Sequence, residues 1–269
     1  MKNKQTLPEE IEKYRDKKWR REEILKIDSP EEVEQLVEDL GFLYTMTDIR
    51  ADLPSVYIAV CGRRDAHMPK NVQKDIESSL AWTLKDEVMR RGEVYYSKLA
   101  KGRAMFVAPR LISYFKAIYG IPKSKEKTEL TDYAKSVLKV LREEWESSTS
   151  DLREDTGIKE RKHLTKAIED LQKCMKVIPY EVLYKPKFTY LWTLAEERFP
   201  DELNKRISRE KAVKELAKIF LEMKGMTFRG ELSKTIGIPR KEAGLANHKL
   251  VDEGFAERIE TGVYKLQNL

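Results

Sequence analysis

The alternation of apolar and polar residues is most regular between residues 130 and 194. A first amphipathic segment spans residues 132–145, and a short polar segment that Ser150 can cap ends at Gly157. A basic helix pattern follows over residues 158–175. The positions expected to face the core of the first and third helices are Tyr133, Val137, Leu138, Leu141, Trp145, Leu164, Ile168, Leu171 and Met175.

Residues 177–194 then alternate in the manner of two strands, which predicts a β-hairpin. Helix, short helix, turn, longer basic helix and hairpin is the order of a winged helix-turn-helix. In that motif the third helix enters a DNA major groove and the hairpin lies against the backbone. The pattern therefore predicts a central winged-helix domain over residues 130–200.

The C-terminal stretch, residues 207–269, repeats this order of elements. Ser208 begins a helix pattern that ends at Gly225, two further helix patterns follow, and the last strands flank Thr261-Gly262. The sequence thus predicts a second winged-helix domain. Its expected core residues are Leu232, Ile236, Leu245, Leu250 and Val251.

The N-terminal half predicts a helical arm over residues 1–28 and a helical, winged-helix-like domain over 29–120. The arm's helix would start near Thr6 and Pro8, with glutamates in its first turn. The basic cluster in this arm (Lys17, Lys18, Arg20 and Arg21) fits either a DNA-touching arm or the solvated face of a packing helix.

Within the N-terminal domain, Ser29 and Glu32 form a capping box. Strands at 93–96 and 104–107 would flank a basic turn, Lys101-Gly102-Arg103. Residues 121–129 are polar and without periodicity, so they are the best candidate linker. The predicted fold class is mostly α with small β (α+β): tandem winged helix-turn-helix domains with short β-hairpins.

Composition adds a bias toward a polyanionic partner. The 269 residues carry a formal net charge of +6, which suits phosphate contacts but on its own also fits ordinary solubility. No apolar run is long enough for a membrane span, and the two cysteines lie far apart. We expect a cytoplasmic protein, with a monomer favoured and its oligomeric state open.

The clustering of cations within the predicted domains identifies candidate DNA contacts. The core face of the third central helix directs its basic residues to the opposite side and to its N-terminal end, which usually reaches base edges. Arg161 would donate two bonds to a guanine and His163 one, while the lysines would bind phosphates. A solvated helix face is the alternative. The candidate residues are Lys159, Arg161, Lys162, His163, Lys166, Lys185, Lys187, Lys101, Arg103, Arg240, Lys241, Asn247 and Lys249.

Motifs of known catalytic chemistry are absent from the sequence. It contains no Gly-rich phosphate loop, HExxH, GxSxG or paired-cysteine motif. The three histidines, His67, His163 and His248, are too scattered to indicate a metal site. Asp86, beside Trp82, could lie near a pocket, although a surface acid is the simpler interpretation. We expect neither a metal nor a cofactor.

Two blocks, LGFLYTMTDIRADLPSVY and WTLKDEVMRRGEVYYSKLAKGRAMFVAP, followed by the two winged-helix patterns, resemble the AlkZ/YcaQ-like winged-helix DNA glycosylases, and most of all their AlkZ-related branch. The resemblance covers roughly residues 30–269. It implies tandem winged helices with a small β-barrel, and an activity that excises alkylated or crosslinked bases.

The resemblance also implies a Gln-apolar-Gln or Gln-apolar-Asp catalytic motif soon after a Leu-Gly pair. Here Tyr44-Thr45-Met46 stands at that place, so the polar groups that would activate the attacking water are missing. Asp48 or Asp52 would have to replace them. An Arg-Ala-His of the family has only a displaced counterpart in Arg64-Asp65-Ala66-His67.

The sequence therefore favours a protein that binds duplex or damaged DNA and lacks the parent reaction. The first alternative is a glycosylase that excises alkylated or crosslinked purines from an extruded nucleotide. The second is a winged-helix protein-interaction scaffold or transcription regulator. An assay for released base tests the first alternative. Size-exclusion chromatography with and without DNA tests the second.

Overall fold

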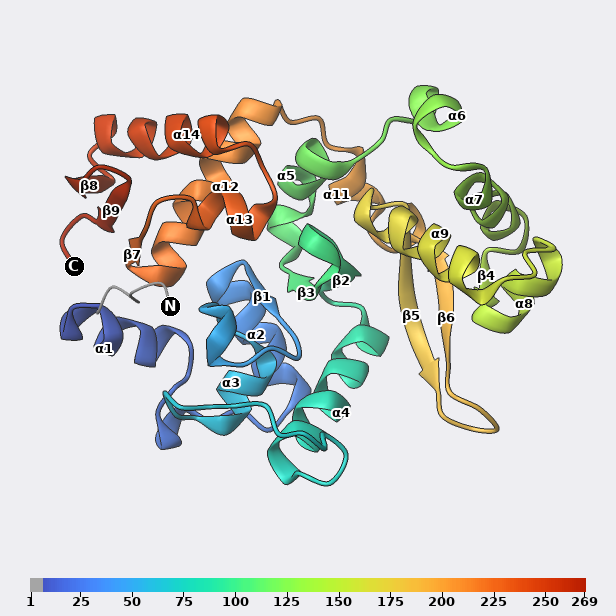
Figure 1. Cartoon of the computed structure of the whole chain (residues 1–269), viewed down its shortest axis with the longest axis horizontal. Helices are drawn as coiled ribbons and strands as arrows, with labels where there is room; N and C mark the ends of the chain where they lie inside the picture. Colours follow the sequence, from blue (N-terminus) through green and yellow to red (C-terminus); the bar gives the residue numbers. More distant parts are fainter. Residues whose placement is uncertain (1–6) are drawn as a thin grey trace.

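The chain is seen here in a computed structural model that describes residues 7–269. Helices alternate with small antiparallel sheets, so the predicted class, mostly α with small β, is confirmed (Figure 1). Thr6, the expected start of the first helix, lies outside the described residues. None of the helices in residues 7–269 is both long and apolar enough to cross a bilayer.

The N-terminal arm is packed against the C-terminal part of the chain. It contains α1 (Glu9–Lys18) and a 3-10 turn, η1 (Glu23–Leu25). Arg15 of α1 is buried, and its guanidinium donates hydrogen bonds to the carbonyl oxygens of Lys224 at 2.9 Å and Met226 at 3.1 Å. The Trp19 indole likewise donates to the carbonyl of Met223 at 2.8 Å. These contacts make the arm part of the folded body.

The next helix, α2 (Pro30–Leu40), has the predicted capping box. The Glu32 amide donates to the Ser29 hydroxyl, and the Glu32 carboxylate accepts from the Ser29 amide. The helix ends at Gly41, whose φ of 83° suits glycine, and a Cβ there would lie 2.6 Å from Leu111 Cδ1. Close packing around Gly41 therefore fixes where the chain turns into the first sheet.

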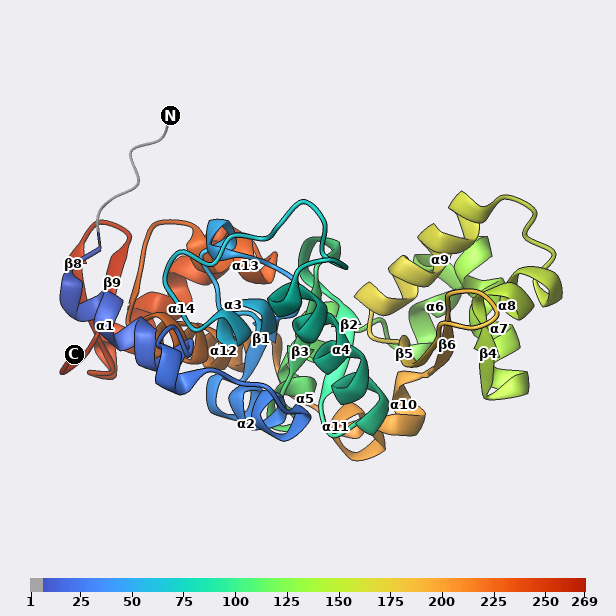
Figure 2. The ribbon, with the colours of Figure 1, turned by 90° about the horizontal axis from the view of Figure 1, so that it is seen from below.

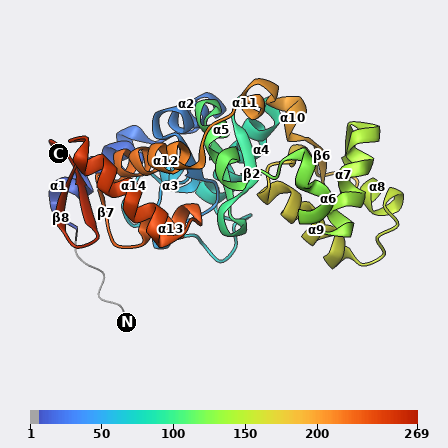
Figure 3. The same cartoon turned by 90° about the horizontal axis from the view of Figure 1, so that it is seen from above.

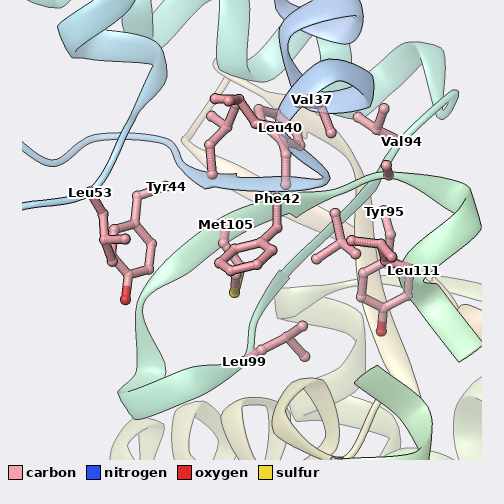
Figure 4. Close-up of a cluster of buried hydrophobic side chains, with 14 of the residues drawn as sticks. Val37, Leu40, Phe42, Tyr44, Leu53, Val94, Tyr95, Leu99, Met105 and Leu111 are labelled. Carbon is pink, nitrogen blue, oxygen red and sulfur yellow. The ribbon is translucent and has the colours of Figure 1, made fainter. Parts of the chain in front are cut away.

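The first sheet has the strand order β1-β3-β2 and supports the main core, part of which Figure 4 shows. The predicted strand 104–107 is found as stated, while the predicted strand 93–96 is found two residues later. The elements of this region are β1 (Phe42–Tyr44), η2 (Ile49–Ala51), α3 (Val56–Cys61), α4 (Ile76–Arg91), β2 (Tyr95–Lys98), η3 (Ala100–Gly102), β3 (Ala104–Val107) and α5 (Pro109–Tyr119).

The central region has the predicted order of helices and hairpin and its own hydrophobic core. Its sheet has the order β4-β6-β5. The three-residue strand β4 lies between α7 and α8 and pairs with β6 of the hairpin. The elements are η4 (Lys123–Lys125), α6 (Glu126–Glu129), α7 (Asp132–Glu144), β4 (Glu146–Ser148), α8 (Thr149–Asp155), α9 (Arg161–Lys173), β5 (Val177–Leu183) and β6 (Thr189–Leu194).

The candidate linker 121–129 contains α6, and Glu126 is bound by Arg142 and Lys176. Two predictions for this region are wrong. Tyr133 and Trp145 do not face the core: they are 45% and 65% exposed. Tyr133 lies in the first turn of α7 and Trp145 follows its last, so neither continues the buried stripe.

The C-terminal region follows two short helices, α10 (Ala195–Arg198) and α11 (Pro200–Asn204), and repeats the central order. Its sheet has the order β7-β9-β8. The elements are α12 (Arg209–Lys224), β7 (Met226–Thr227), α13 (Glu231–Ile236), α14 (Arg240–Asp252), β8 (Ala256–Glu260) and β9 (Val263–Leu266). The predicted core residue Leu245 is 55% exposed, because α14 buries the face of Ala243, Ala246 and Leu250 instead.

The first sheet lies between the other two regions. Figure 1, Figure 2 and Figure 3 all show the central region at one end and the C-terminal region, beside α1, at the other. The main core includes residues of α12, α13 and α14 together with the first sheet, whereas the core of the central region is separate. The central region packs on the rest of the chain chiefly through β5 and α9, which contact α4 and β2, and α10 contacts β6.

Candidate nucleic-acid interface

A hollow of about 1130 Å³ lies between the start of α9 and the β5–β6 hairpin. Lys159 and Arg161 line it from the helix side, and Lys185 and Lys187 line it from the hairpin tip. These residues are exposed. The structure therefore brings together four cations that the sequence analysis had placed on two separate elements.

The charge of this hollow is not neutralised by its own surroundings. Its lining holds five basic side chains, the fifth being Arg153, against the two acids Asp151 and Glu154. Within residues 7–269, no ion pair engages the four cations named above. Unpaired, exposed cations around a concave surface are what a polyanion binds.

Other candidates on α9 are partly occupied. Lys162 pairs with Glu160 at 2.8 Å, and Lys166 pairs with Asp170 at 2.7 Å, both on the exposed surface. The imidazole of His163 stacks on the ring of Tyr133, with 4.8 Å between centroids. His163 is thus held against α7, whereas Arg161 is exposed and no ion pair among residues 7–269 engages it.

The basic turn of the first sheet lies outside the hollow. Lys101 is exposed in η3, and the guanidinium carbon of Arg103 lies 5.5 Å from the ring centroid of Tyr44. The neighbouring Lys98 pairs with Glu169 of α9 at 3.0 Å, so this turn lies along the side of that helix. Lys101 and Arg103 are therefore near α9 and separate from the four cations of the hollow.

The candidates in the C-terminal region are dispersed. Arg240 and Lys241 are exposed in the first turn of α14, and Lys249 pairs with Glu210 of α12. The prediction that Asn247 is exposed is wrong, because only 8% of it is accessible. Asn247 shares the buried face of α14, where a base edge has no access to it.

Tyr44 and Asp48, at and just after the place of the expected catalytic motif, do not offer a free base to a water molecule. Tyr44 lies in β1 and is buried, and burial raises the pKa of its hydroxyl. Asp48 caps η2, and hydrogen bonds from Arg50 lower the pKa of its carboxyl to about 2. The Met68 amide also donates to Asp48, at 3.0 Å. Asp48 is therefore tied to its own loop.

Asp52, the other carboxylate considered, is half-exposed and pairs with two buried cations. Its Oδ1 lies 3.1 Å from Arg15 and its Oδ2 2.7 Å from Lys224, which also pairs with Glu231. Burial would raise the pKa of Asp52, but Lys224 and Arg15 outweigh it and lower the pKa. This arrangement joins α1, η2 and α12. Among the described residues no cluster of His, Cys, Asp and Glu could hold a metal ion.

Sequence reasoning missed how the hairpin is attached to α4. Lys85 and Asp86 of α4 are buried and form an ion pair at 2.5 Å. The Tyr184 hydroxyl donates to Asp86, and the Lys85 ammonium donates to the Tyr190 hydroxyl at 3.3 Å. The only signal was an apolar stripe on α4 interrupted by the Lys-Asp pair, which gives no hint of a partner on the distant hairpin.

Comparisons with known proteins agree with this architecture. The model of a family described as AlkZ related matches residues 27–237. The solved structure of Streptomyces sahachiroi DNA glycosylase AlkZ is similar, with a TM-score of 0.52 and 11% sequence identity, over 94% of this chain and 69% of that one. At this identity the likeness concerns the fold. No curated protein sequence matches the chain.

Proposed function

We propose that this chain, which belongs to the AlkZ-related family, binds duplex DNA and does not excise bases. The solved protein of similar fold is a DNA glycosylase, so DNA is the partner that the relationship favours. In this proposal residues 29–120, 130–200 and 207–269 are three domains, and the last two are winged helices.

The observation that carries the proposal is the hollow between α9 and the hairpin. In a winged helix the third helix and the wing both face DNA, and here these two elements contribute unpaired cations to one concave surface. Phosphates of one strand would contact Lys185 and Lys187 while the start of α9, with Arg161, faces the groove. Phosphate contacts would supply most of the affinity.

The arrangement of Asp48 and Asp52 favours binding without excision. A general base must be free to approach water, and its pKa must lie near the working pH. Asp48 has a pKa of about 2 and is held by Arg50, while Asp52 is shared between Arg15 and Lys224. Neither carboxylate meets the requirement for activating a nucleophile.

A charge-reversal experiment tests the proposal. Lys185→Glu/Lys187→Glu should weaken binding to a labelled duplex by at least about 100-fold at low salt in fluorescence anisotropy, because two phosphate contacts become repulsive. The matched control is Lys135→Glu/Lys139→Glu on α7, which makes the same change in net charge outside the hollow. Equal weakening by both pairs would mean that only net charge matters, and the proposed interface would be wrong.

A further inference from the structure

A row of aromatic side chains runs from α4 to the tip of the hairpin. The Trp82 indole donates to the Tyr184 hydroxyl at 2.8 Å, and the Tyr184 and Phe188 rings lie 5.6 Å apart. Phe188 continues to Tyr190 at 5.3 Å, and Tyr190 to Trp192 at 5.6 Å. Trp192 is buried and Tyr190 is partly buried, whereas Trp82, Tyr184 and Phe188 are 36%, 54% and 47% exposed.

This exposed aromatic surface, made by Trp82, Tyr184 and Phe188, adjoins the basic hollow. Phe188 belongs to both, since it also lines the hollow with Arg161 and Lys187. The Phe188 ring meets Tyr184 at 66° and Tyr190 at 81°, so these rings contact edge to face and do not stack flat on one another. An incoming flat ring would therefore find aromatic faces beside phosphate-binding cations.

The neighbouring charges exclude a basic ligand. The Lys85 ammonium lies 4.3 Å from the centroid of Trp82 and is also near the rings of Tyr96 and Tyr190, so the chain's own lysine fills the cation-binding side of these aromatics. Lys185 and Lys187 line the hollow together with Phe188. A ligand that combines negative charge with flat rings fits this surface, and unpaired nucleotides have both properties.

We propose that Trp82, Tyr184 and Phe188 stack unpaired bases, so that the protein prefers DNA in which a duplex adjoins an unpaired stretch. This inference rests on the proposed DNA binding and specifies the DNA structure. The paired part would lie on the start of α9, and the unpaired strand would pass over the hairpin tip with its phosphates near Lys185 and Lys187. Base stacking on aromatic rings tolerates any sequence.

The experiment compares a labelled duplex with the same duplex containing a central bubble of mismatched bases. The wild-type protein should bind the bubble about tenfold more tightly, which corresponds to the stacking of one base. Phe188→Leu keeps an apolar side chain but removes the aromatic face, so the ratio of bubble affinity to duplex affinity, measured for this variant, should fall most of the way to 1. Phe188→Tyr, which keeps the face, should retain the preference.

Three outcomes of this experiment would overturn the stacking inference. Equal affinity of the wild-type protein for bubble and duplex would overturn the stacking inference and leave duplex binding intact. A preference that survives in Phe188→Leu would also overturn it, because an apolar contact would then suffice. Binding to neither DNA would overturn the proposed function and this inference together. Circular dichroism verifies that both variants are folded.

Discussion

The hydroxyl of Tyr184 donates a hydrogen bond to the carboxylate of Asp86, which lies 98 residues earlier in the chain. Asp86 in turn forms the buried ion pair with Lys85. Burial, with the nearby carboxylate as a further cause, raises the pKa of Tyr184 to about 12, so the hydroxyl remains a donor at neutral pH. The hairpin that carries the candidate interface is thus fixed to α4.

The first prediction concerns this bond. Tyr184→Phe should lower the free energy of unfolding by about 2 kcal/mol, because a buried carboxylate loses a hydrogen-bond donor. Urea denaturation measures the change. The control is Tyr133→Phe, whose ring stacks on His163 and is 45% exposed. A loss of the same size in the control would show that the bond to Asp86 has no special role.

Arg161 and Lys162 should differ in their effect on DNA binding, although they are neighbours. Arg161 lines the hollow, whereas Lys162 lies outside it and pairs with Glu160. Arg161→Ala should therefore weaken binding and lower the slope of log affinity against log salt by about 1, while Lys162→Ala should change the slope by less than half of that. Anisotropy titrations at several salt concentrations measure both, and an unchanged slope for Arg161→Ala would remove α9 as a contact.

Some of these features could be predicted from the sequence, and others could not. The helix α9 and the hairpin have strong periodicity, and so their basic residues were placed on the correct elements. The strand β4 has three residues, too few to show alternation. On α14 the buried face consists largely of Ala243, Ala246 and Leu250. Alanines contribute little to a hydrophobic pattern, so the exposed Leu245 was assigned to the core instead.

The attachment of the hairpin to α4 illustrates the limit of sequence patterns. Lys85 and Asp86 look like ordinary surface residues in the sequence, since charged side chains are seldom buried without partners. Their partners, Tyr184 and Tyr190, are about a hundred residues away, and only the packing of the central region on α4 brings them together. Long-range pairing of this kind leaves no periodic pattern.

The network around Asp52 gives a prediction for stability. Asp52→Asn should lower the free energy of unfolding by about 3 kcal/mol, because Arg15 and Lys224 would remain buried with less opposing charge. Asn suits this position, since φ is 52° there and asparagine tolerates the left-handed region. The matched control, Asp39→Asn, loses only a surface pair with Arg20 and should cost less than about 1 kcal/mol. Equal losses would contradict a structural role for the network.

Asp48 should contribute to the stability of the protein in acid. Its folded pKa of about 2 lies below the ordinary value of 3.8, so its contribution is complete above about pH 4 and is lost as the pH falls through 2. Asp48→Asn should cost about 2 kcal/mol at neutral pH and much less near pH 2. Denaturation at the two pH values measures the difference, and a cost independent of pH would mean that the charge of Asp48 is not what stabilises the loop.

The last prediction separates a binding protein from a glycosylase. DNA carrying N7- or N3-alkylpurines, incubated with the protein, should release free base no faster than it does without protein, as measured by chromatography. Tyr44 and Met46 offer neither an amide nor a carboxylate to a water molecule, and Asp48 is held at a pKa of about 2. Protein-dependent release that Asp48→Asn or Asp52→Asn abolishes, with the variant still folded and still bound to DNA, would show that the carboxylate does activate water and that the chain is an enzyme.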